Sequence, residues 1–86
     1  MPFVLTGRFR RAYCSLPDEE QKRIQRALIR MSKDLRHPGL RVKRIRGTHG
    51  IWEARASRAL RLTFEVEGDK IILRNVGSHD ATLKRP

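Results

Sequence analysis

The chain has 86 residues, the size of one small domain, and we expect residues 1–86 to form a single domain. Twenty lysine and arginine residues against nine aspartate and glutamate residues give a formal net charge of +11. Hydrophobic residues make up 38% of the chain, which excludes a disordered basic tail because a core can be built. The charge predicts a polyanionic partner, most often a nucleic acid, whereas charge used only for solubility needs a far smaller imbalance.

The single cysteine, Cys14, excludes an intramolecular disulfide and a metal site built from cysteines. A reducing cytoplasm fits this composition. No apolar stretch approaches the length that spans a bilayer, and the first residues lack the charged start of a signal peptide. We therefore expect a cytoplasmic protein that makes no membrane contact.

The first forty residues predict a short strand and two helices. The apolar run at residues 3–5 favours a strand, although so short a run is ambiguous in type. Apolar residues at helical spacing predict a helix over about residues 8–15. Pro17 and the three acidic residues after it mark the start of a second helix, over about residues 18–35, which the His-Pro-Gly sequence at 37–39 ends. Its apolar stripe consists of Ile24, Ala27, Leu28, Met31 and Leu35.

The second half changes to the period of two that is typical of strands. Residues 40–46 form a basic extended segment, and residues 51–56 and 60–66 alternate apolar and polar side chains. Residues 71–73 are apolar throughout, as in a strand that is covered on both faces. We therefore predict an α+β domain with a short N-terminal strand, two helices and an antiparallel meander of three to four strands.

The faces of the second and third of these segments predict how they pair. A two-residue loop between them would mix polar with apolar faces, whereas a three-residue loop at 57–59 matches them. The matched register places Trp52 across from Phe64 and Arg55 across from Arg61. Because the neighbours of Trp52 on its face are apolar, we assign it to the core rather than to base stacking.

The predicted pair of Arg55 and Arg61 points to a bound anion. Two like charges directly across a strand pair are destabilising unless an anion lies between them. A compact turn at residues 68–69 brings Arg74 to the same side of the sheet. Arginines that splay into solvent are the alternative, but the net charge and the fit of guanidinium to phosphate favour a phosphate site.

His79 follows the last predicted strand, at the rim of this arginine face. Histidine side chains exchange protons near neutral pH, so His79 is a candidate for acid or base catalysis. His37 and His49 lie beside Pro38 and Gly50 and are assigned to loops. Three histidines scattered in this way lack the spacing of a metal site, and we predict no metal.

Short motifs along nearly the whole chain carry a family resemblance: Leu16-Pro17, His37-Pro38-Gly39-Leu40, Gly50-Ile51-Trp52-Glu53-Ala54-Arg55, Arg61 and Val76-Gly77-Ser78-His79-Asp80. Together with the order of elements, they resemble the RelE/ParE superfamily of type II toxins. Many members are endoribonucleases that enter the ribosomal A site and cut mRNA without a metal, by attack of the 2′-hydroxyl on the adjacent phosphate. The resemblance implies a small twisted antiparallel sheet packed on two helices. It also implies no cofactor, and as partners mRNA, ribosomal RNA and a cognate antitoxin.

Carried over to this chain, the resemblance implies four catalytic residues. Arg55 and Arg61 would bind the scissile phosphate and stabilise its developing charge. Glu53 lies near the position where some members carry an acidic general base, and His79 matches a histidine that acts as general acid or base. The residues that we predict to contact RNA are Lys43, Arg44 and Arg74.

One departure from the family pattern concerns the C-terminal segment. Many ribonuclease members carry Tyr or Phe a few residues beyond the last strand, where this chain has Thr82 and Leu83, so the mechanism depends more on His79. Two alternatives stay open. A ParE-like inhibitor of DNA gyrase cuts nothing and needs no catalytic histidine, and a non-enzymatic RNA-binding or ribosome-associated module is supported by the charge alone.

Overall fold

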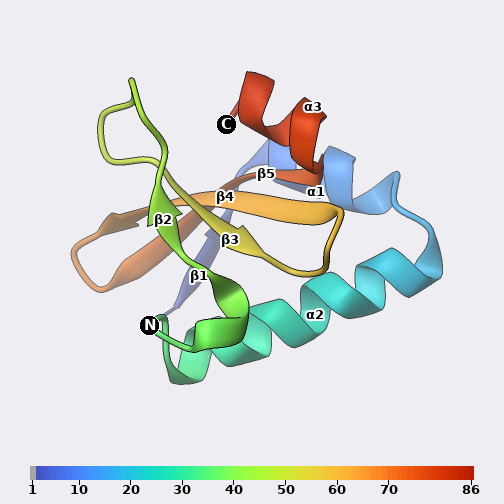
Figure 1. Cartoon of the computed structure of the whole chain (residues 1–86), viewed down its shortest axis with the longest axis horizontal. Helices are drawn as coiled ribbons and strands as arrows, with labels where there is room; N and C mark the ends of the chain where they lie inside the picture. The colour runs from blue at the N-terminus through green and yellow to red at the C-terminus, as the bar shows by residue number, and fades with distance from the viewer. Residues whose placement is uncertain (1) are drawn as a thin grey trace.

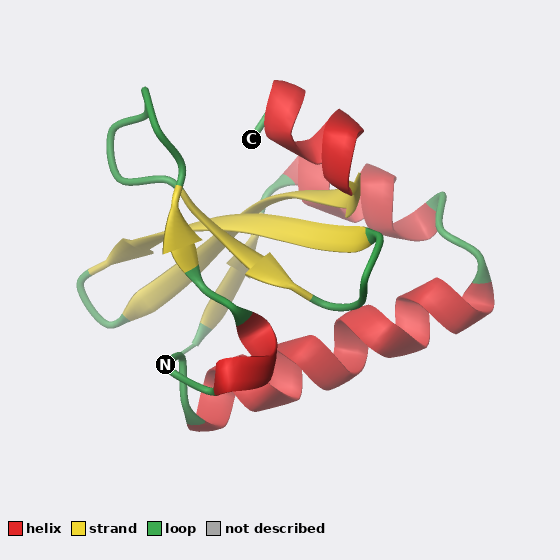
Figure 2. Ribbon diagram, viewed as in Figure 1, coloured by secondary structure: helices red, strands yellow, loops and turns green. Residues whose placement is uncertain are grey.

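The computed structural model describes residues 2–86 and contains a five-stranded sheet with helices on both faces (Figures 1 and 2). The order of strands in the sheet is β1-β5-β4-β3-β2. The elements in chain order are β1 (Phe3–Leu5), α1 (Gly7–Cys14), α2 (Asp18–Lys33), the 3₁₀ helix η1 (Pro38–Leu40), β2 (Lys43–Arg44), β3 (Trp52–Arg55), β4 (Leu60–Glu67), β5 (Lys70–Ser78) and α3 (His79–Lys84).

The predicted α+β order of a strand, two helices and an antiparallel meander is confirmed. The sheet is nevertheless mixed, because β1 pairs with β5 in parallel, with Phe3 opposite Ile71. The predicted meander did not include this pairing, which joins segments almost seventy residues apart.

The predicted register between β3 and β4 is also confirmed. Trp52 pairs with Phe64 and Arg55 pairs with Arg61, across a turn at residues 57–59. The even-numbered side chains of both strands therefore share one face of the sheet, and the odd-numbered side chains share the other. We call the first face the α2 side, because α2 packs there, and the second the α3 side (Figure 1).

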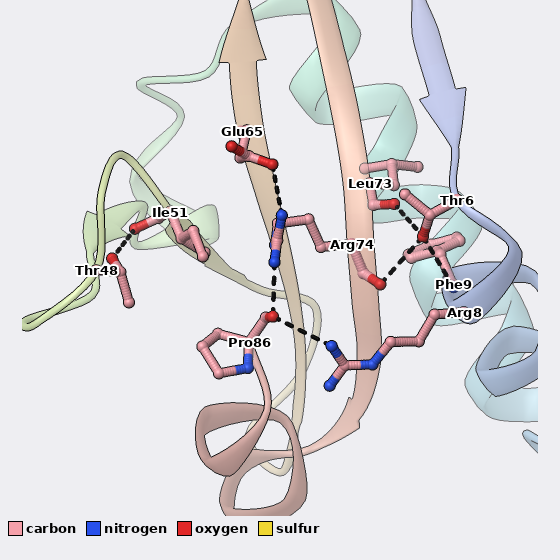
Figure 3. A network of polar contacts seen from close by, with 9 residues as sticks. All are labelled: Thr6, Arg8, Phe9, Thr48, Ile51, Glu65, Leu73, Arg74 and Pro86. Carbon is pink, nitrogen blue, oxygen red and sulfur yellow. Dashed lines mark hydrogen bonds and ion pairs between the residues drawn. The ribbon is translucent and has the colours of Figure 1, made fainter.

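Thr6 fixes the start of α1 against the sheet (Figure 3). Its Oγ1 accepts a hydrogen bond from the backbone N–H of Phe9 at 3.1 Å, as an N-cap does, and donates to the carbonyl oxygen of Leu73 at 2.9 Å. One side chain thus caps the helix and ties it to β5.

Helix α2 begins at Asp18, with Pro17 as the residue before it and three acidic residues in its first turn. It ends at Lys33, two residues before the predicted end, because Asp34 adopts an extended conformation. The chain then forms η1, where His37 Nδ1 accepts a hydrogen bond from the backbone N–H of Gly39 at 3.0 Å. The segment that was predicted to end the helix therefore forms the short 3₁₀ helix η1.

One hydrophobic core fills the α2 side. Helices α1 and α2 both contribute to it. Trp52, which was assigned to the core, is partly buried and packs against it, as does Tyr13. The residues of this core that are buried are Phe9, Ile24, Ala27, Met31, Leu40, Ala54, Leu60, Leu62, Phe64, Ile71, Leu73 and Val76.

Helix α3 is an element that the sequence did not predict. It starts at His79, directly after the last strand, and it covers part of the face opposite α2 (Figure 1). Ser78 caps it, and Thr82 is buried against the sheet. A Cβ on Gly77 would lie 3.3 Å from Oγ1 of Thr82, so glycine permits this close approach.

The basic segment at 40–46 contains only a two-residue strand, β2. Residues 45–51 form a projecting loop, closed by a 2.9 Å hydrogen bond from the backbone N–H of Ile45 to the carbonyl oxygen of Ile51. Thr48 Oγ1 also donates to the carbonyl oxygen of Ile45, at 2.6 Å. None of the described helices is long and apolar enough to span a membrane.

Candidate functional site

A hollow of about 170 Å³ lies on the α3 side of the sheet, at the end of the β3–β4 hairpin that carries the turn. Neighbouring strands β2, β3 and β4 supply four of its side chains, and η1 ends at the fifth. We call it the arginine hollow, and it is lined by Arg41, Lys43, Glu53, Arg55 and Arg61. Four of these residues were predicted site residues, and Arg41 was not.

Arg55 stands at the centre of this positive charge. It lies directly across the strand pair from Arg61. Partial burial lowers the pKa of its guanidinium, and the charges of Arg41, Arg61 and Arg58 lower it further. Since arginine stays protonated in proteins, deprotonation does not relieve this repulsion, whereas a bound anion would.

Arg61 is held by the turn that joins β3 and β4. Its Nη1 donates to the carbonyl oxygens of Ser57 at 2.7 Å and of Arg58 and Leu60 at 3.2 Å each. Within residues 2–86 its other guanidinium nitrogens make no hydrogen bond. The side chain is therefore oriented by one nitrogen and has donors left for a ligand.

Glu53 supplies a carboxylate to the same hollow. The sequence placed it on a polar face, yet only 4% of its surface is exposed. Its Oε1 lies 3.6 Å from Nζ of Lys43, which is opposite it on β2 and well exposed. A buried carboxylate with a single exposed ammonium partner remains available as a proton acceptor beside the arginines.

His79, which the sequence analysis placed at the rim of the arginine face, is not among the residues that line the arginine hollow. Its backbone N–H donates to the carbonyl oxygen of Ala59 at 3.0 Å, so it touches the turn that also holds Arg61. Its Nδ1 is 3.3 Å from Oδ1 of Asp80, and about half of its side chain is exposed. The imidazole is therefore accessible, with a carboxylate beside it.

Arg74 is on the α3 side as predicted, but outside the arginine hollow. Its Nη1 contacts Oε2 of Glu65 at 2.6 Å, and its Nε donates to the carbonyl oxygen of Pro86 at 3.4 Å (Figure 3). Arg8 also donates to the Pro86 carbonyl oxygen, at 3.5 Å. The guanidinium of Arg74 thus joins β4, β5 and the last residues of the chain.

A second hollow, of about 330 Å³, continues the basic surface toward the 45–51 loop. It shares Lys43 and Glu53 with the arginine hollow, and Leu83 of α3 forms one of its walls. Arg44, a predicted RNA contact, lies here together with Arg46, which the sequence analysis did not select. We call these two hollows, which share Lys43 and Glu53, the basic trough.

The largest of these cavities, about 570 Å³, opens on the α2 side and has a mainly apolar floor that includes Trp52, Phe64 and Val66. Arg41 lines this apolar groove as well as the arginine hollow. Among residues 2–86 there is no cluster of three His, Cys, Asp or Glu side chains that could hold a metal ion.

No protein-family model matches the chain, and no curated protein matches its sequence. Solved structures do match. YafQ from E. coli is 8% identical with a TM-score of 0.78, covering 92% of this chain and 93% of that one. A YoeB/ParE toxin from Agrobacterium tumefaciens is 15% identical with a TM-score of 0.76, covering 92% and 99%.

A RelB–RelE antitoxin–toxin complex from Methanococcus jannaschii contains a chain that is 23% identical, with a TM-score of 0.71 and coverage of 96% of this chain and 99% of that one. All three similarities extend over nearly the full length of both chains. This protein therefore has the fold of the RelE/ParE superfamily, as the sequence predicted.

Proposed function

We propose that this protein is the toxin of a type II toxin–antitoxin system and acts as a metal-independent, ribosome-dependent endoribonuclease that cuts mRNA. The observation that carries the proposal is the arginine hollow, where Arg55 and Arg61 face each other beside a buried carboxylate. Two of the structural neighbours support the toxin role, because they are named as toxins and one of them is a complex with its antitoxin.

The proposed reaction is attack of the RNA 2′-hydroxyl on the adjacent phosphorus. The bond from the 2′-oxygen to phosphorus forms, and the bond from phosphorus to the 5′-oxygen of the next nucleotide breaks. Glu53 accepts the proton of the 2′-hydroxyl, and His79 gives a proton to the departing 5′-oxygen. Arg55 and Arg61 stabilise the extra negative charge on the phosphate oxygens in the transition state.

The trough gives a course for the RNA strand. A single strand whose scissile phosphate lies in the arginine hollow would continue past Lys43 toward Arg44, along the second hollow. Contacts of this kind release counterions, so RNA binding should weaken steeply as salt is raised. A flat salt response would contradict a phosphate site.

A cognate antitoxin is the proposed protein partner. The arginine hollow and the second hollow are both rich in positive charge, so a segment that covers them should be acidic or amphipathic. Such a segment would occupy the same surface as RNA and block cleavage.

The test of this function is His79→Ala on ribosomes programmed with a defined mRNA. Cleavage should be abolished while ribosome binding stays within a few-fold of the wild type, because about half of the His79 side chain is exposed and its removal should leave the fold intact. His49→Ala, in the exposed 45–51 loop, is the matched control and should cut normally. Unchanged cleavage by His79→Ala would remove the histidine from the mechanism.

Mapping of mRNA 5′ ends after induced expression, beside a gyrase supercoiling assay, tests the function as a whole. In-frame cuts would support the ribonuclease. Trapped gyrase with intact mRNA would instead select the ParE-like alternative, and neither effect would leave a non-enzymatic RNA-binding module.

A further inference from the structure

Arg41 has an unusual backbone conformation. Its φ of +45° and ψ of +48° place it in the left-handed region, and it is the one non-glycine residue of the described chain with a positive φ. Side chains other than those of glycine and asparagine are disfavoured there. Its backbone N–H donates to the carbonyl oxygen of Pro38 at 3.3 Å and closes the end of η1. A turn alone would be served better by glycine or asparagine.

The arginine side chain is also not explained by a partner within the protein. Its guanidinium makes no hydrogen bond or ion pair to any residue in 2–86. It adds instead to the positive charge around Arg55, whose pKa it helps to lower. Both the conformation and the charge of Arg41 therefore oppose folding in the absence of a ligand.

Arg41 lies where a bound RNA strand could offset these unfavourable contributions. Strand β2 pairs only with Trp52 and Glu53, so the outer edge of β3 is left open at Ala54 and Arg55. Arg41 lies at this open edge and lines cavities on both faces of the sheet. A strand of RNA that leaves the arginine hollow on this side must pass its guanidinium.

We propose that Arg41 binds an RNA phosphate next to the scissile one and thereby fixes where the strand lies in the trough. This inference rests on the proposed function, because it takes single-stranded RNA as the ligand. Lys43 and Arg44 would hold the strand on one side of the scissile phosphate, and Arg41 would hold it on the other. The turn after η1 is thus built to present a phosphate ligand rather than only to reverse the chain.

The test compares Arg41→Asn with Arg26→Gln. Asparagine tolerates the left-handed conformation, so the first variant removes the guanidinium while keeping the turn. Arg26 is an exposed residue of α2, away from the arginine hollow, and its replacement removes the same charge. The probe is a 2′-O-methyl single-stranded RNA oligonucleotide, which cannot be cut, titrated over a series of salt concentrations.

Arg41→Asn should bind the probe about 10-fold more weakly at low salt and lower the slope of log affinity against log salt by about 0.7, the value for one phosphate contact on a single strand. Its melting temperature should equal or exceed that of the wild type. Arg41→Lys should restore the slope but not the full affinity, because the forked contact is lost.

Equal affinity and slope for Arg41→Asn and Arg26→Gln would overturn the role of Arg41 while leaving RNA binding by the wild type intact. A wild type that shows no salt-dependent binding of the probe would overturn the RNA site as a whole, and Arg41 with it. A clear drop in the melting temperature of Arg41→Asn would overturn the proposal, because the guanidinium of Arg41 would then serve the fold.

Discussion

The arginines at the two ends of the α3 side of the sheet differ in the hydrogen-bond acceptors around them. At one end, Arg74 is held by the carboxylate of Glu65 and the carbonyl oxygen of Pro86. At the other end, Arg55 and Arg61 face each other, and the nearby carboxylate of Glu53 is paired with Lys43. The first arginine has its acceptors within the protein, whereas the second group has an excess of donors that a ligand can use.

The difference shows why arginine content alone does not locate a binding surface. From the sequence, Arg55, Arg61 and Arg74 form one group on one face. In the structure, β5 bulges at Arg74, which lies between the Thr63–Asn75 and Phe64–Leu73 pairs and contacts Glu65. An arginine paired with a carboxylate belongs to the architecture, and one that faces another guanidinium and keeps free donors is a candidate ligand for phosphate.

The largest effect that separates the two groups should come from Arg61→Ala. If Arg61 stabilises the phosphate charge in the transition state, the cleavage step should lose about 2–4 kcal/mol. The loss of its hydrogen bonds to the turn should cost the fold about 1 kcal/mol. Single-turnover cleavage on programmed ribosomes measures the first quantity, and urea unfolding measures the second.

Arg61→Lys is the control, because it keeps the charge and loses the fork. Its cleavage rate should fall between those of the wild type and Arg61→Ala. A fully active Arg61→Ala would place this side chain with Arg74 among the structural arginines, and the comparison between the two ends would fail.

A smaller effect, on stability rather than on cleavage, is expected from Arg74→Met, which keeps the apolar stem. About a third of each side chain in the Arg74–Glu65 pair is exposed, so solvent screens it in part. We expect the free energy of unfolding to fall by about 1 kcal/mol, with cleavage reduced far less than in Arg61→Ala.

The control for Arg74→Met is Lys22→Met, which breaks the more exposed pair with Glu19 on α2 and should leave stability unchanged. If Arg74→Met keeps its stability and instead loses RNA affinity, the result would support the RNA contact that the sequence predicted for Arg74.

Much of the fold follows from the sequence because alternation along β3 and β4 permits one match of faces. That match fixes Trp52 opposite Phe64 and Arg55 opposite Arg61. The same reasoning could not find the parallel pairing of β1 with β5, since a three-residue strand carries no signal for a partner so distant along the chain. The periodicity of a sequence indicates local secondary structure, whereas the pairing of β1 with β5 joins distant parts of the chain.

The candidate site was predictable where it lies on strands and less so elsewhere. Helix α3 has six residues, too few for a periodic signal, although Ser78 before Asp80 is the kind of start that a helix cap provides. Because α3 was not predicted, the sequence analysis did not foresee that Leu83 lies beside Glu53 or that Glu53 is buried. Arg41 stands in a run of basic residues at 41–46, and only its backbone conformation singles it out.

The smallest effect, a gain in stability rather than a loss, should come from Arg55→Thr measured without RNA. Threonine suits a strand, and its introduction removes the like charge opposite Arg61. The melting temperature should therefore rise by a few degrees at most, and the gain should shrink as salt screens the charges. Arg44→Thr, the same exchange on β2, lacks an arginine opposite it and should give no such gain. A loss of stability in Arg55→Thr would mean that Arg55, like Arg74, has acceptors within the protein.

Addition of a non-cleavable RNA should reverse the order of the two melting temperatures, because only the wild type keeps the full set of phosphate contacts and is stabilised by the bound strand.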